Sequence, residues 1–253
     1  MHVVFTIASL APRFGGPSRS VPALCGALRA RRVDAQIVAL RERRDQREPC
    51  NQLPGVKWVD CRTHRYLPIG WPKRFKRELR SAISGGKDAI VHDAGLWLPS
   101  NHYAALIARE AQVQRVVSPR GMLSAWALNH AGARKKIVWH LRQKHDLESA
   151  SMLHATAETE AEEFRRCGLR APIAVVPNGV DVPPPIPRPL RADTSQRVAL
   201  FLSRLHPKKG LLDLVAAWAA VRPNGWRMVV AGPDEGGYRA VIENAVREAG
   251  ILD

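Results

Sequence analysis

The chain has 253 residues, of which 45% are hydrophobic and 25% are charged, a composition typical of a folded globular protein. It carries 39 lysines and arginines against 23 acidic residues, which gives a formal net charge of +16. No run approaches the roughly 18–20 apolar residues that span a bilayer, so we expect any membrane contact to be peripheral.

The charge predicts an anionic partner, and it does not choose among nucleic acid, an anionic membrane surface and a phosphorylated substrate. The four cysteines match no metal-ligand spacing, and the N-terminal MHVVFTIASL is too short for a secretory leader. We therefore expect a cytoplasmic protein with reduced thiols and no metal site. The cysteines are Cys25, Cys50, Cys61 and Cys167.

Short apolar runs alternate with helical patterns, which predicts an α/β fold with parallel sheets. In the first part of the chain, strands are expected at 3–8, 35–40, 56–59, 88–92, 115–117, 152–156 and 173–176. Helices are expected after the turn at Gly15 and Gly16, then at 71–84, 101–111, 132–150 and 157–167.

The first turn carries a glycine pair, Gly15 and Gly16, and Ser18 is expected to cap the helix that follows. Glycine lets a ligand approach the backbone closely, and a helix start offers free N–H groups. The alternative is a plain strand-to-helix turn.

Two polar side chains follow later strands of the same predicted sheet. His92 ends the strand 88–92, and Arg120 comes just after 115–117, next to Gly121. Parallel sheets bind ligands beyond the carboxyl ends of their strands, so both residues are candidates to line a cleft. His92 is either a hydrogen-bonding or proton-handling group or a histidine of the cleft wall. Arg120 either pairs with a phosphate or sugar carboxylate or is solvated.

Two basic helices carry apolar residues at helical spacing. In 71–84, Trp71, Phe75, Leu79 and Ile83 lie four apart, which predicts a core-facing stripe. A membrane-surface role for the cationic face of this helix is the alternative. In 132–150, Trp139 is interleaved with cations, which predicts a packed helix whose basic face can rest on anionic lipid. With 6% aromatic residues and no RNA-recognition motif, we expect no specific nucleic-acid partner.

A proline-rich segment divides the chain. Five prolines between Pro183 and Pro189 predict a stiff linker over 183–196. The expected domains are therefore an N-terminal domain over 1–182 and a C-terminal domain over 197–253.

The C-terminal domain is predicted to contain two β-α units, with strands at 198–202 and 227–231 and helices at 211–221 and 238–249. The unbroken apolar run 198–202 predicts a strand buried on both faces. Arg204 and Lys209 lie between that strand and the next helix, where a helix N-terminus favours anions, so they are placed to hold a diphosphate. A solvated loop is the alternative.

Three motifs in order carry a family resemblance: VVPNGVD at 175–181, SRLHPKKG at 203–210 and VVAGPD at 229–234. Together they resemble the retaining, nucleotide-sugar-dependent glycosyltransferases of family 4, which have the GT-B fold of two Rossmann-like domains. The resemblance implies transfer of a hexosyl group to a saccharide or lipid-linked acceptor, without a metal or other cofactor, in polysaccharide biosynthesis. It also implies roles for the candidate residues: His92 and Arg120 as catalytic residues on the acceptor side, Gly15, Gly16, Arg204 and Lys209 at the donor diphosphate, and Gly232 and Asp234 beside the nucleoside.

One family motif is out of place. The family's second domain carries two glutamates separated by seven residues, and Glu235 and Glu243 have this spacing but directly follow Gly-Pro-Asp. We interpret the match as coincidental and expect the sequence to stop partway through an incomplete donor domain. A bare sheet edge would then invite a partner chain or self-association.

Two rival hypotheses remain. The first is a non-catalytic remnant that docks on a membrane or a partner, and the second is a basic nucleic-acid binder, which only the charge supports.

Overall fold

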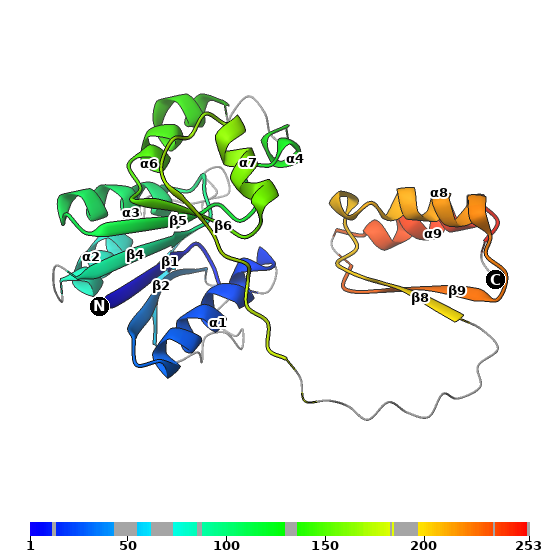
Figure 1. Cartoon of the computed structure of the whole chain (residues 1–253), viewed down its shortest axis with the longest axis horizontal. Coiled ribbons are helices and arrows are strands. Elements are labelled where there is room, and N and C mark those ends of the chain that lie inside the picture. Colours follow the sequence, from blue (N-terminus) through cyan, green and yellow to red (C-terminus); the bar gives the residue numbers. More distant parts are fainter. Residues whose placement is uncertain are drawn as a thin grey trace. The chain divides into compact units, whose positions relative to one another are not determined.

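The computed structural model describes residues 1–11, 14–42, 55–61, 73–84, 88–129, 136–182, 184, 197–234 and 236–251. The chain forms two compact units, Met1–Asp181 and Val182–Asp253 (Figure 1). Both contain parallel strands joined by helices, so the predicted α/β class is confirmed.

The first unit is built on a seven-stranded parallel sheet. Its order is β3-β2-β1-β4-β5-β6-β7, so the chain runs outward from β1 to β3 and then returns to the other side of β1. Ligands of such sheets bind at this reversal, beyond the carboxyl ends of β1 and β4. All seven predicted strands are present within two residues at each end: β1 His2–Ile7, β2 Asp34–Glu42, β3 Val56–Cys61, β4 Ala89–Ala94, β5 Gln114–Ser118, β6 Met152–Ala155 and β7 Ile173–Val175.

Helices cover both faces of this sheet. They are α1 Pro17–Ala30, α2 Lys73–Ile83, α3 Pro99–Glu110, α4 Ala125–Asn129, α6 Lys144–Glu148 and α7 Glu158–Arg166. The prediction that Ser18 caps α1 is wrong: Gly16 is the N-cap, and the Ser18 hydroxyl inside the first turn donates to the Gly15 carbonyl at 2.7 Å.

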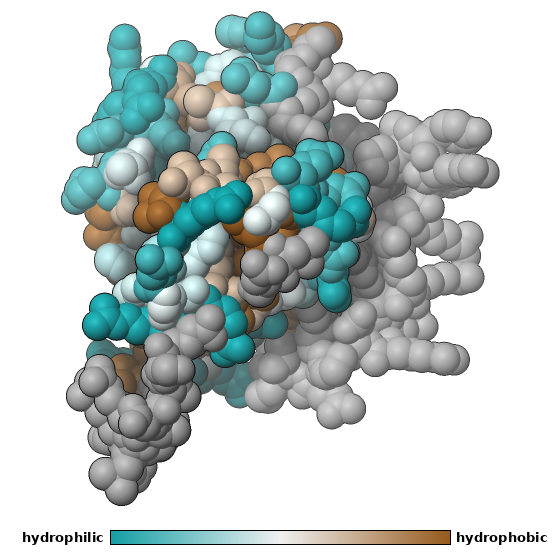
Figure 2. All heavy atoms as spheres, turned by 90° about the vertical axis from the view of Figure 1, so that its right-hand side faces the viewer, coloured by the Kyte–Doolittle hydropathy of each residue, from teal (hydrophilic) through white to brown (hydrophobic). Residues whose placement is uncertain are grey.

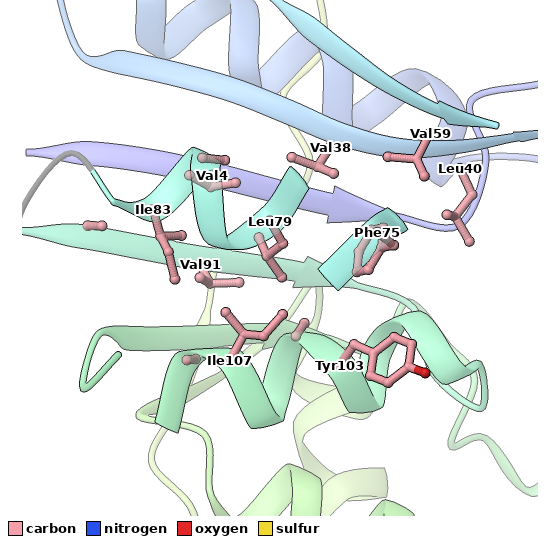
Figure 3. Close-up of a cluster of buried hydrophobic side chains, with 14 residues drawn as sticks. Val4, Val38, Leu40, Val59, Phe75, Leu79, Ile83, Val91, Tyr103 and Ile107 are labelled. Atoms are coloured by element: carbon pink, nitrogen blue, oxygen red, sulfur yellow. The ribbon is translucent and has the colours of Figure 1, made fainter. Parts of the chain in front are cut away.

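The largest apolar cluster lies between the sheet and helices α2 and α3. Figure 3 shows Phe75, Leu79 and Ile83 of α2 pointing toward valines of the central strands. The predicted core-facing stripe is therefore confirmed for these three residues, whereas Trp71 lies outside the described residues. The opposite face packs against Val21 and Cys25 of α1.

In the helical segment from residue 136 to α6, some apolar side chains pack against the protein and others are exposed. It includes a π-helical turn, Trp139–Gln143, and Trp139 lies with its ring centroid 6.2 Å from that of Trp97. Ile137 and Leu141, however, are 60% and 79% exposed. In the described part of the chain, no helix is both long and apolar enough to cross a bilayer.

The second unit contains a two-stranded parallel sheet, β8 Arg197–Leu202 and β9 Trp226–Ala231, with helices α8 Leu211–Val221 and α9 Tyr238–Glu248. Leu205, Leu211, Val215 and Ile242 form its core. Apolar residues also reach the molecular surface among polar ones, as Figure 2 shows for one side.

The prediction that the strand at 198–202 is buried on both faces is wrong. Leu200 and Leu202, which share one face of β8, are 61% and 75% exposed. The apolar contacts of this unit's core come from the other face, where Phe201 packs with residues of α8 and α9.

We expect Leu79→Ala to lower the free energy of unfolding of the first unit by about 2–5 kcal/mol, because it empties a fully buried site. The matched control Leu141→Ala removes the same atoms from an exposed site and should change stability by less than about 0.5 kcal/mol. Urea denaturation measures both, and equal losses would contradict this description of the core.

Candidate active site

The loop after β1 lies at the point where the sheet order reverses. Gly15 has a φ of +79°, a conformation that favours glycine, and Gly16 begins α1. A β-carbon on Gly16 would meet no atom of the described residues within 4 Å, so packing against them does not require glycine there. The backbone at Gly16 is therefore open to close approach by a ligand.

His92 lies two residues before the end of β4, next to Phe5 of β1, with 5.0 Å between ring centroids. Its Nε2 lies 2.7 Å from the Ser118 hydroxyl, which lies 2.7 Å from His154 Nδ1. Burial, followed by the charges of His154 and Arg120, lowers the pKa of His92 to about 3. Because a catalytic base works best with a pKa near the working pH, this favours a hydrogen-bonding role over proton transfer.

Arg120 occupies a tight loop after β5. Its φ is +57°, and Gly121 follows at +72°. The guanidinium donates from Nη1 to the side-chain oxygen of Asn178, which belongs to the VVPNGVD motif. Its buried Nε has no hydrogen-bond partner among the described residues, and burial lowers its pKa while Glu160 opposes that shift. An anionic oxygen would satisfy this N–H with a charge-assisted hydrogen bond.

Glu160 of α7 holds the Arg120 loop from below. Its buried carboxylate accepts from the Gly121 backbone at 2.6 Å, and from the backbone and hydroxyl of Thr156 at 2.7 and 2.8 Å. Nothing in the sequence indicated that Glu160 contacts a loop 39 residues away.

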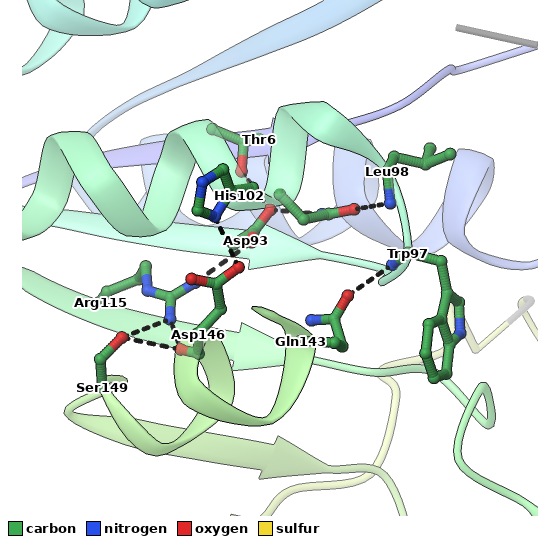
Figure 4. Close-up of polar contacts among 10 residues, drawn as sticks. Thr6, Asp93, Trp97, Leu98, His102, Arg115, Gln143, Asp146 and Ser149 are labelled. Atoms are coloured by element: carbon green, nitrogen blue, oxygen red, sulfur yellow. Dashed lines mark hydrogen bonds and ion pairs between the residues drawn. The ribbon is translucent and has the colours of Figure 1, made fainter. Parts of the chain in front are cut away.

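A buried ion pair joins β4 to β5 (Figure 4). Asp93 accepts from Thr6 at 2.7 Å and from Asn101 at 2.9 Å, and its second oxygen lies 3.5 Å from Arg115 Nη1. Arg115 also donates to the Asp146 carbonyl. Burial raises the pKa of Asp93 to about 6, although Arg115 opposes the shift. Sequence reasoning missed this cluster because each member lies on a different element.

In the second unit, Arg204 is half-buried and Lys209 is exposed. Lys209 ends a 3₁₀ turn, Pro207–Lys209, in which the His206 ring accepts from the Lys208 backbone at 3.1 Å. Gly210, with a φ of +67°, is the N-cap of α8. Lys209 therefore lies directly before the N-cap of this helix.

Gly232 is required by the backbone of its neighbour strand. A β-carbon at Gly232 would lie 1.8 Å from the Ser203 carbonyl oxygen, and the φ is +148°. The Leu205 backbone donates to the Pro233 carbonyl at 2.9 Å. The loop that carries Arg204 is thus fixed against the turn that carries Asp234.

Asp234 is exposed and accepts from the Arg239 backbone at 3.1 Å, which caps the first turn of α9. Glu243 pairs with Arg239 one helical turn away, at 2.6 Å. That contact is local to α9, and Glu235 lies outside the described residues.

The predicted site residues divide between the two units. In the first unit, Gly15 and Gly16 follow β1, Arg120 follows β5, and His92 lies near the carboxyl end of β4, all toward the same edge of the sheet. In the second unit, the loop after β8 and the turn after β9 bring Arg204 and Asp234 to one end of the short sheet. Within the described ranges, no group of three or more potential metal-ligating side chains occurs.

This architecture is that of the GT-B glycosyltransferases. HepE of Anabaena, solved with UDP and glucose, is 17% identical with a TM-score of 0.67, and the match covers 100% of this chain and 67% of HepE. The lipopolysaccharide outer core galactosyltransferase WaaB is 17% identical with a TM-score of 0.62, and the match covers 99% of this chain and 66% of WaaB. A TarM mutant of S. aureus, solved with fondaparinux, α-GlcNAc-glycerol and UDP, is 9% identical with a TM-score of 0.66. The match covers 100% of this chain and 76% of TarM.

The model of the glycosyl transferase 4-like domain matches residues 15–179, well over half of the sequence. The chain belongs to this family and is a glycosyltransferase by family and fold. No curated protein matches the sequence. The chain spans about two thirds of the length of HepE and WaaB.

Removal of the Arg115 guanidinium should make the stability of the protein depend on whether Asp93 is ionised. In Arg115→Met the pKa of Asp93 rises further, so the folded variant carries an unpaired buried carboxylate at high pH and a protonated one at low pH. We expect the free energy of unfolding to fall by about 3–5 kcal/mol near pH 8 and by clearly less at pH 5. Urea denaturation at both pH values measures the difference.

The control for this prediction is Arg80→Met, which breaks the exposed pair of Arg80 with Glu110. It should change stability little at either pH, because water solvates both charges. An equal loss at pH 5 and pH 8 for Arg115→Met would contradict the charged state inferred for Asp93.

Proposed function

We propose that this chain binds a nucleotide-sugar donor and carries out, or takes part in, retaining transfer of a hexosyl group to a saccharide or lipid-linked acceptor. One observation carries the proposal: the loop that contains Arg204 lies against the turn at Gly232. The two backbones are so close there that no residue larger than glycine fits at position 232. HepE and TarM, which share the fold, were solved with UDP.

Arg204 and Lys209 are proposed to bind the donor diphosphate. Negative charge develops on that leaving group, and preorganised cations lower the barrier most where charge develops. They also supply the charge that a metal would otherwise provide, so the proposal includes no metal or other cofactor. Gly232 and Asp234 lie beside the nucleoside in this proposal, with the exposed carboxylate able to accept from a ribose hydroxyl.

The first unit, over roughly 1–182, is proposed as the acceptor-side domain and 197–253 as part of the nucleotide-sugar-binding domain, joined by the linker 183–196. Gly15 and Gly16 would offer backbone N–H groups to the donor phosphates. Arg120 would pair through its unmatched Nε with an anionic group of acceptor or donor, and His92 would contact a hydroxyl.

A second candidate function is peripheral docking on the cytoplasmic face of a membrane. Ile137 and Leu141 are exposed beside Lys136 and Arg142, an arrangement that suits insertion of apolar side chains below anionic headgroups. This function is compatible with catalysis on a lipid-linked acceptor, and it would also suit a non-catalytic docking protein. A partner chain could instead cover the exposed face of β8.

Calorimetric titration with UDP, GDP and ADP tests the donor site. We expect one nucleotide to bind, and the double variant Arg204→Ala, Lys209→Ala to weaken it by at least tenfold, since each lost charge-assisted bond is worth about 1.5–3 kcal/mol. Arg247→Ala removes an exposed cation from the far end of α9 and should leave binding unchanged. A folded wild-type chain that binds none of the three would refute the proposal.

Co-sedimentation with vesicles tests the membrane function. The wild-type chain should bind vesicles with 30% anionic lipid and not neutral ones, since binding needs both charge and apolar insertion. Ile137→Gln with Leu141→Gln should reduce binding at constant net charge. Ile83→Gln is not a suitable control because Ile83 is buried, whereas Val241→Gln changes an exposed apolar residue on α9 and should have no effect.

A further inference from the structure

A series of three hydrogen bonds runs from His92 across the neighbouring strands of the sheet. His92 Nε2 lies 2.7 Å from Ser118 Oγ, Ser118 Oγ lies 2.7 Å from His154 Nδ1, and His154 Nε2 lies 2.8 Å from the Val176 carbonyl. These residues lie on β4, β5, β6 and just after β7, four successive strands of the sheet. Ser118 and His154 are buried. These hydrogen bonds therefore connect the carboxyl-terminal parts of four neighbouring strands.

The chemistry of the groups determines which atom donates and which accepts in each of these hydrogen bonds. A carbonyl oxygen only accepts, so His154 Nε2 carries a proton that it donates to Val176. In a neutral ring, His154 Nδ1 then accepts, and the Ser118 hydroxyl donates to it. Ser118 has no second proton, so its oxygen must accept from His92 Nε2–H.

The remaining nitrogen of His92 follows from this direction. With its pKa near 3, the ring is neutral at pH 7 and carries one proton, which lies on Nε2. Nδ1 is therefore an acceptor. No described residue hydrogen-bonds to it, and His92 as a whole residue is partly exposed.

We propose that Ser118 and His154 are positioning residues, which hold His92 in the Nε2-protonated tautomer and so present Nδ1 as a hydrogen-bond acceptor to a bound hydroxyl. An unprotonated nitrogen binds hydroxyl donors and repels the acceptor oxygens of phosphates, which Arg120 attracts. The two neighbours thus divide recognition between neutral and anionic groups. That the hydroxyl belongs to a sugar rests on the proposed function, whereas the tautomer does not.

Long-range ¹H–¹⁵N correlation spectra of the ¹⁵N-histidine-labelled chain at pH 7 report the tautomer directly. Loss of signals in His92→Gln assigns the ring. We expect wild-type His92 to be protonated on Nε2 alone. Ser118→Ala and His154→Phe should each produce a measurable Nδ1-protonated fraction, because the acceptor for Nε2–H is removed or loses its fixed orientation. Ser118→Thr, which keeps the hydroxyl, should retain the wild-type tautomer.

Ser84→Ala removes a hydroxyl that donates to the local backbone at Ser81, so it should leave the His92 signals unchanged. A wild-type His92 protonated on Nδ1 or on both nitrogens would overturn the proposal. So would an unchanged tautomer in both Ser118→Ala and His154→Phe when urea denaturation shows them folded. Absence of nucleotide binding would instead refute the proposed function and leave the tautomer result standing, so the two failures are distinguishable.

Discussion

The buried pair of Arg115 with Asp93 is the interaction on which the site of the first unit depends. Asp93 follows His92 in β4, and Arg115 reaches across from β5 while it also binds the backbone ahead of β6. Taking two charges out of water is costly unless each is matched by hydrogen bonds. Thr6 and Asn101 donate to one carboxylate oxygen of Asp93, and Arg115 pairs with the other, so side chains of both β1 and β5 hold this position of β4.

In the proposed site of this unit, His92 would recognise neutral groups and Arg120 charged ones. Burial keeps the His92 ring neutral, and the bonded Ser118 and His154 leave it one orientation. Arg120, by contrast, keeps its charge in a strained loop that Glu160 holds through the Gly121 backbone. Such strain at a functional loop persists only where surrounding contacts determine the conformation. A sugar phosphate presents both hydroxyls and anionic oxygens, which these two side chains match.

The second unit depends on a different constraint, the contact between two backbones at Gly232 and Ser203. This contact fixes the loop that carries Arg204 after β8, and it brings the motifs SRL and AGPD together although they are far apart in sequence. The exposed face of β8, with Leu200 and Leu202, shows that the same strand is not buried on both sides within this chain. Apolar composition alone therefore did not determine its burial.

The sequence by itself determined the strands, the α/β class and the family, because these rest on local periodicity and on short motifs whose order survives in the chain. It also placed His92 and Arg120 near the carboxyl ends of neighbouring strands, although β4 continues two residues beyond His92. The tertiary structure alone decided the links among Asp93, Arg115 and Asp146, the hold of Glu160 on Gly121 and the direction of the bonds from His92 to Val176. These contacts join residues tens of positions apart, and burial sets the charge of each group, so no local pattern could have carried them.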